Sequence, residues 1–100
     1  MKQLRIGITG AFGFIGQELV RLLSAQGHDL VLLSRSAKKL EHQSSVTVIE
    51  ADLSQPKPEV IAKFTHDLDV LYHLAAELNN PLSMHATNVV GTQAIVNTLP

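Results

Sequence analysis

Hydrophobic and polar positions form alternating blocks along this chain. Four short, largely apolar runs have the length and composition of strands, and the first two have the pattern of strands buried on both faces. They span residues 4–9, 30–33, 46–49 and 70–74. Helical patterns separate them at residues 13–26 and 58–64, and another follows at 86–99. In the first helix the apolar stripe expected to lie on the sheet consists of Ile15, Leu19, Leu22 and Leu23. The alternation predicts βαβ units, and therefore an α/β fold with a parallel sheet covered by helices.

Three glycines stand where the first strand passes into the first helix, in a segment (residues 10–16) that we call the glycine turn. Gly10, Gly13 and Gly16 follow one another at intervals of three. A strand-to-helix turn uses glycine where φ is positive, where backbone approaches a ligand and where the helix packs tightly on its strand. The helix then directs its unpaired N–H groups and positive dipole end into the turn, which favours a pyrophosphate. The alternative is a tight turn that binds no nucleotide.

Length, charge and composition narrow the classes of function. A chain of 100 residues allows one domain, and its net charge of -1 predicts no general attraction to nucleic acid or to an anionic membrane. It has no cysteine, so disulfides and thiolate metal sites are excluded, and its histidines form no ligand pair at helical spacing. No apolar run approaches the roughly 20 residues of a membrane span. We expect a cytoplasmic protein that acts on a small molecule and binds no metal.

The segment Ile8-Thr9-Gly10-Ala11-Phe12-Gly13-Phe14-Ile15-Gly16 resembles the fingerprint of short-chain dehydrogenases/reductases. Its closest match is the extended branch, the epimerase/dehydratase-like family. The resemblance implies a Rossmann-type doubly wound parallel sheet, of which residues 1–100 hold the first four strands in the order 3-2-1-4. It also implies that the turn binds the cofactor through Gly10, Gly13, Phe14, Ile15 and Gly16.

The residues after the second strand bear on the choice of cofactor. A fold that prefers NAD carries Asp or Glu about 20 residues beyond the glycine turn, where the carboxylate accepts from the ribose hydroxyls. This chain has Ser34 and Arg35 there, and no carboxylate until Glu41. A guanidinium can bind a 2′-phosphate through paired charge-assisted hydrogen bonds, whereas a carboxylate would repel it. We therefore predict NADP rather than NAD, with Arg35 on the 2′-phosphate and Ser34 or Ser36 as a neutral donor. The alternative is that Arg35 lies in a solvated loop.

Three later segments also match the family and imply further contacts. An Asp and an apolar residue after the third strand, here Asp52 and Leu53, hold the adenine in the family; alternatively, Asp52 is a turn residue. The H-x-A-A segment implies that backbone at the end of the fourth strand lies against the ribose and pyrophosphate. In this chain that backbone belongs to Leu74, Ala75 and Ala76, which could instead be a plain strand end. The N-V-x-G-T segment implies that Asn88 faces the phosphates and that the glycine lets its helix pack closely; alternatively, Asn88 is a helix cap or faces solvent.

The groups that perform chemistry in this family are absent from the sequence. In the family the tyrosine of a Y-x-x-x-K pair is the general acid and base, and the lysine lowers the pKa of that tyrosine. Here the single tyrosine, Tyr72, stands four residues before Ala76 and is predicted to be a core residue. We expect residues 1–100 to be the amino-terminal part of a dinucleotide-binding domain, with an unpaired edge at the fourth strand. The full-length protein would be an oxidoreductase, epimerase or dehydratase that moves a hydride at a carbinol or carbonyl carbon of a small-molecule substrate, and could form a homodimer. The alternatives are a non-catalytic nucleotide-binding or redox-sensing module and a truncated relic.

Overall fold

The computed structural model describes residues 2–35, 45–75 and 90–99. Strands and helices alternate along these parts of the chain, as the apolar pattern predicts. In chain order they are β1 (Arg5–Thr9), α1 (Phe14–Ala25), β2 (Asp29–Ser34), β3 (Val46–Glu50), α2 (Pro58–Thr65), β4 (Val70–His73) and α4 (Thr92–Thr98). Most ends lie within one residue of their predicted positions. The first residues of the helix predicted at 86–99 lie outside the described parts, and α4 begins at Thr92.

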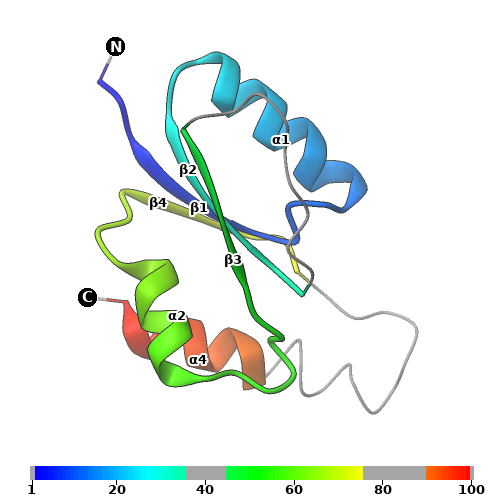
Figure 1. Ribbon diagram of the computed structural model, residues 1–100, viewed down its shortest axis with the longest axis vertical. Helices are drawn as coiled ribbons and strands as arrows, with labels where there is room; N and C mark the ends of the chain where they lie inside the picture. Colours follow the sequence, from blue (N-terminus) through cyan, green and yellow to red (C-terminus); the bar gives the residue numbers. More distant parts are fainter. Residues whose placement is uncertain (1, 36–44, 76–89, 100) are drawn as a thin grey trace.

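The four strands form one parallel sheet in the order β3-β2-β1-β4, which confirms the predicted Rossmann-type topology. In the register, Ile8 of β1 lies between Leu32 of β2 and Tyr72 of β4. The helix α1 lies on one side of the sheet, and α2 and α4 lie together on the other (Figure 1). Because parallel strands need such crossover helices, both faces of the central strands are covered.

Two hydrophobic cores result, one on each face. Successive residues of β2 point to opposite faces, and Leu30, Val31, Leu32 and Leu33 are all between 0% and 2% exposed. The core beneath α1 contains Ile6, Ile8, Ala11, Val20, Leu30 and Leu32. The core beneath α2 and α4 contains Val31, Leu33, Leu53, Ile61, Phe64 and Ile95. This division explains why β2 has no polar face.

The side of α1 that faces the sheet differs from the predicted stripe. Gly16 and Val20 are the buried residues of this helix, whereas Ile15 is 69% and Leu22 is 46% exposed. The cause is Gly16, where a Cβ would collide with the Gly10 carbonyl oxygen and lie 2.8 Å from the Cα of Ala11. Because the backbones are this close, the side of α1 that carries Gly16 must face the end of β1. The rest of the helix is rotated accordingly, and the prediction that Ile15 and Leu22 contact the sheet is wrong.

Tyr72 is also placed differently from the prediction. It was expected in the core, but it is 38% exposed. Its neighbour in the register is the fully buried Ile8, so the two side chains share a face of the sheet. Because β4 is the last strand of the described sheet, Tyr72 lies beyond the centre that α1 covers.

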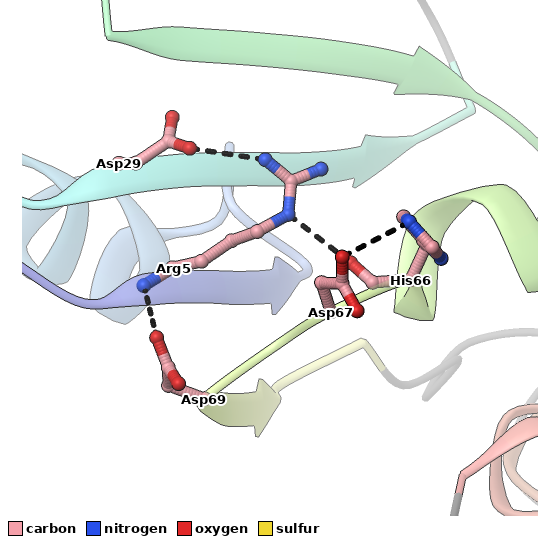
Figure 2. A network of polar contacts seen from close by, with 5 residues as sticks. All are labelled: Arg5, Asp29, His66, Asp67 and Asp69. Carbon is pink, nitrogen blue, oxygen red and sulfur yellow. Dashed lines mark hydrogen bonds and ion pairs between the residues drawn. The ribbon is translucent and has the colours of Figure 1, made fainter.

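A polar network connects the amino ends of the strands (Figure 2). The guanidinium of Arg5 binds the Asp29 carboxylate at 3.0 Å and donates from Nε to the carbonyl of His66 at 3.1 Å. The backbone N–H of Arg5 donates to the carboxylate of Asp69 at 2.8 Å. Next to His66, Asp67 has a positive φ of 56°. Arg5 thereby joins β1, β2 and the connection from α2 to β4 at the edge opposite the glycine turn.

Candidate functional site

The glycine turn lies at the carboxyl edge of the sheet, between β1 and α1. Gly10 has a φ of 68°, which residues with a Cβ rarely adopt. A Cβ on Gly10 would lie 2.8 Å from the backbone N of Ala75 and 2.8 Å from the carbonyl carbon of Leu74. The turn therefore requires glycine at this position, and the backbone at the end of β4 lies directly against it.

The amino end of α1 opens away from this packed backbone. Gly13 is the N-cap residue, its N–H donates to the carbonyl of Gly10 at 3.1 Å, and no side chain caps the helix. The first turn carries no acidic residue, so its N–H groups and dipole meet no negative charge there. Phe14 is 94% and Ile15 is 69% exposed. This end of the helix can accept an anion.

Gly13 and Gly16 have different surroundings. A Cβ on Gly13 would meet only the Gly10 carbonyl oxygen, at 3.4 Å, which is ordinary contact. A Cβ on Gly16 would collide with that same oxygen and lie 2.8 Å from the Cα of Ala11. Gly16 therefore permits close packing of helix and strand, whereas Gly13 keeps the outer side of the turn open.

The ends of β2 and β3 lie side by side next to the turn. Ser34 pairs in register with Glu50, and the N–H of Ala51 donates to the carbonyl of Ser34 at 2.8 Å. This pairing brings Arg35 and Asp52, the next residues along each chain segment, to the same edge of the sheet. Arg35 is exposed, and its charge helps to lower the pKa of Asp52.

Asp52 stabilises its own turn. Its Oδ1 accepts from the Ser54 hydroxyl at 2.6 Å and from the Ser54 N–H at 2.9 Å. These two hydrogen bonds, the hydroxyl first, lower the pKa of Asp52 more than the charge of Arg35 does. The interpretation of Asp52 as a turn residue is therefore correct. A contact with adenine remains a prediction, and it would fall to the other carboxylate oxygen.

Leu53 supports the same loop from the core. It is 5% exposed and packs among the apolar residues beneath α2 and α4. A Cβ on Gly91, just before α4, would lie 2.7 Å from the Leu53 carbonyl oxygen. The start of α4 is thus pressed against this loop. Little of the Leu53 side chain is available to a ligand.

A chain of hydrogen bonds links the ends of β1 and β4 to the start of α4. The hydroxyl of Thr9 accepts from the N–H of Ala75 at 3.1 Å and lies 2.6 Å from Nδ1 of His73. Nε2 of the same ring lies 2.7 Å from the hydroxyl of Thr92. Burial lowers the pKa of His73, so the ring is neutral at pH 7.

Thr9, His73 and Thr92 were not among the predicted site residues. All three stand in the segments that carry the family resemblance: Thr9 just before the glycine turn, His73 as the first residue of H-x-A-A and Thr92 as the last of N-V-x-G-T. Of the predicted residues, Gly10 lies against Leu74 and Ala75, and Arg35 lies near Asp52. Ser36, Ala76 and Asn88 lie outside the described residues.

Within residues 2–35, 45–75 and 90–99, no group of His, Cys, Asp and Glu is arranged to hold a metal ion. None of the helices described there is long and apolar enough to cross a membrane.

Comparison with known proteins identifies sequence relatives of the chain and solved structures that share its fold. The profile of the NAD dependent epimerase/dehydratase family matches residues 6–99. UDP-glucuronic acid decarboxylase 4 of Arabidopsis thaliana is 28% identical over 97 residues, which cover 91% of this chain and 22% of that protein. The 2-alkyl-3-oxoalkanoate reductase of Stenotrophomonas maltophilia (strain K279a) is 29% identical over 96 residues, or 93% of this chain and 28% of that protein. The chain therefore spans only about a quarter of the length of these relatives.

Solved structures share the fold. The Bordetella bronchiseptica enzyme WbmG, in complex with NAD, superposes with a TM-score of 0.80 at 23% identity, covering 97% of this chain and 34% of that one. Uronate dehydrogenase from Agrobacterium tumefaciens gives a TM-score of 0.81 at 18% identity, covering 98% of this chain and 36% of that one. At these identities the likeness establishes the fold alone.

Proposed function

Because the chain belongs to the NAD dependent epimerase/dehydratase family, we propose that it is the NADP(H)-binding part of an oxidoreductase, epimerase or dehydratase. The full-length protein would move a hydride at a carbinol or carbonyl carbon of a small-molecule substrate. The observation that carries the proposal is the uncapped amino end of α1, which opens beside Gly13 at the carboxyl edge of the sheet. In open α/β sheets this edge is where ligands bind.

Different residues around the turn would contact different parts of a bound dinucleotide. The pyrophosphate would lie on the first turn of α1 and against Gly13, where N–H groups and the helix dipole favour negative charge. The backbone of Leu74 and Ala75 would border the ribose next to it. The adenosine would lie toward the ends of β2 and β3, near Arg35 and Asp52. A nicotinamide bound there would supply the chemistry of hydride transfer, and the residues named above would hold and orient the dinucleotide.

The preference for NADP rests on charge at the end of β2. Arg35 is exposed there and stands next to Ser34, so neither position carries a carboxylate that would repel a 2′-phosphate. Asp52 lies within electrostatic reach of Arg35, but its Oδ1 is held in the turn by Ser54. A guanidinium that meets a phosphate forms charge-assisted hydrogen bonds, each worth about 1.5–3 kcal/mol.

Calorimetry with NADPH and NADH tests the proposal. We expect the native chain to prefer NADPH, and Arg35→Asp to lose about tenfold to a hundredfold in NADPH affinity while NADH affinity stays within a few fold. The matched control is Lys2→Asp, which makes the same change of charge at an exposed position near the opposite edge of the sheet. An unchanged ratio of the two affinities in Arg35→Asp would refute the NADP assignment. Failure of a folded sample to bind either dinucleotide would refute the nucleotide site itself.

A nucleotide-binding module without turnover is the second candidate. It is favoured by the composition of residues 1–100, where the single tyrosine, Tyr72, is followed four residues later by Ala76 and not by lysine. A Y-x-x-x-K pair in the natural protein outside these residues would support the enzyme, and a natural protein without one would support the module.

A further inference from the structure

The hydrogen bonds between Thr9, His73 and Thr92 connect three elements at one point. Thr9 is the last residue of β1, His73 the last of β4 and Thr92 the first of α4. Thr9 and His73 stand 64 positions apart in the sequence, and their side chains approach to 2.6 Å. The Thr9 side chain is completely buried. Its hydroxyl must therefore find partners inside the protein.

The number of protons on each group determines the direction of the hydrogen bonds among Thr9, His73 and Thr92. The Thr9 oxygen already accepts from the N–H of Ala75. Within the described parts of the chain, the acceptor that the Thr9 O–H faces is Nδ1 of His73. Nδ1 then carries no proton, so the proton of the neutral ring lies on Nε2 and is donated to the hydroxyl of Thr92. The opposite tautomer would leave the buried Thr9 O–H without an acceptor among these residues.

These hydrogen bonds end at Ala75, which lies directly against the glycine turn. Ala75, whose N–H is held by Thr9, has its backbone N 2.8 Å from the position of a Cβ on Gly10. There is no spare space between these two pieces of backbone. A shift of Ala75 therefore displaces the turn that precedes α1.

We propose that His73 is a positioning residue for the nucleotide site. Thr92 orients the ring of His73, and the ring accepts a hydrogen bond from the Thr9 hydroxyl. This contact orients the hydroxyl so that its oxygen accepts from the N–H of Ala75, which holds the end of β4 against Gly10. The effect on nucleotide affinity rests on the proposed function, whereas the effect on Ala75 is independent of any ligand. If His73 only filled space, the position of its polar atom would be irrelevant.

A pair of variants that differ by one methylene separates these possibilities. In His73→Asn the side-chain amide reaches the place of Nδ1 and can still accept from Thr9, whereas in His73→Gln it reaches the place of Nε2. We measure hydrogen exchange of the Ala75 amide by NMR and NADPH affinity by calorimetry. His73→Gln should raise the exchange rate of Ala75 about fivefold, as for loss of one hydrogen bond, and weaken NADPH binding by a similar factor. His73→Asn should stay within about twofold of the native chain in both.

Thr9→Val provides the control, because valine keeps the branched shape and removes the hydroxyl. It should raise the exchange rate of Ala75, and adding His73→Gln to it should cause no further rise, since the route through the hydroxyl is already lost. In the native chain, nitrogen chemical shifts should place the ring proton of His73 on Nε2. The inference is overturned by equal effects of asparagine and glutamine, by additive effects in the double variant, or by the opposite tautomer.

If His73→Gln does not fold, Thr92→Val tests the same proposal. It removes the partner of Nε2, so the ring loses its fixed orientation and Ala75 should exchange faster; an unchanged exchange rate contradicts the proposal. If the native chain binds no dinucleotide, the proposed function fails, while the exchange of Ala75 still decides the role of His73.

Discussion

Asp52 and His73 show that polar side chains at the carboxyl ends of the strands first stabilise their own surroundings. Asp52 accepts twice from Ser54, and His73 bridges two threonines. Both residues have a lowered pKa, the first because of hydrogen bonds to its carboxylate and the second because of burial. Each therefore keeps the charge state that its neighbours require at pH 7.

The lowered pKa of His73 predicts a dependence of stability on pH. As the pH falls, His73 of the unfolded chain takes up a proton near its ordinary pKa of 6.5, whereas His73 of the folded chain does so only at a lower pH. The unfolded state thus binds more protons in the window below that value, and the free energy of unfolding falls as the pH falls through it. Above about pH 7.5 both states are neutral at this residue and no such loss occurs.

Urea unfolding at about pH 7.5 and about pH 5.5, with His73→Asn as the comparison, measures this contribution. The other histidines are common to both proteins and cancel. The native chain should lose more stability than the variant between the two pH values. Parallel losses would show that His73 titrates alike in the folded and unfolded states.

At the scale of elements, the junction of β1, α1 and β4 depends on how closely backbones approach. Gly10, Gly13 and Gly16 resemble one another in sequence, but only the first and last have backbone where a Cβ would lie. Gly13 has ordinary space on that side. The spacing of three therefore combines two packing positions with one position whose outer side is open.

This difference predicts opposite effects of the same substitution. Gly16→Ala should destabilise the fold by about 1–3 kcal/mol, because α1 must move away from Gly10 and Ala11. Gly13→Ala should cost less than about 1 kcal/mol in stability, since its φ of -74° suits alanine, but it should weaken dinucleotide binding by occupying the open side of the turn. Urea unfolding and calorimetry on both variants test the pair. Similar stabilities for the two variants, or unchanged affinity in Gly13→Ala, would contradict this division of roles.

At the scale of the whole molecule, the carboxyl and amino ends of the strands form two edges of the sheet with different roles. The carboxyl edge carries the glycine turn and the candidate site, and the amino edge is connected by Arg5. The guanidinium reaches Asp29 at the start of β2 and the carbonyl of His66 after α2, with about a third of each charged side chain exposed. A substitution at the amino edge should therefore lower the free energy of unfolding without changing ligand affinity at the carboxyl edge.

Arg5→Leu tests this separation. It removes the ion pair with Asp29 and one hydrogen bond, so we expect a loss of about 1–2 kcal/mol in unfolding free energy that shrinks at high salt. Dinucleotide affinity of the folded variant should be unchanged. Arg21→Leu is the control, because its partner Glu18 lies on the same exposed helix surface and the pair should contribute far less. Equal losses in the two variants, or a fall in affinity in Arg5→Leu, would contradict the assignment.

Local features of the sequence determined much of this protein. The apolar runs of β1 and β2 were recognisable because both of their faces are buried, and the glycine turn was recognisable because a positive φ and close packing each demand a residue without a side chain. The strand order was implied by a family resemblance carried by these same residues, and the sheet has that order.

Only the tertiary structure decided what depends on distant segments meeting. The face that α1 turns to the sheet is determined by contact of Gly16 with the glycine turn, and Tyr72 is exposed because β4 lies last in the described sheet. The contacts of Thr9 with His73 and Ala75 join residues 64 and 66 positions apart, a separation over which no periodicity extends. Such contacts arise when two strands become neighbours, because pairing then brings the polar residues at their ends within hydrogen-bonding distance.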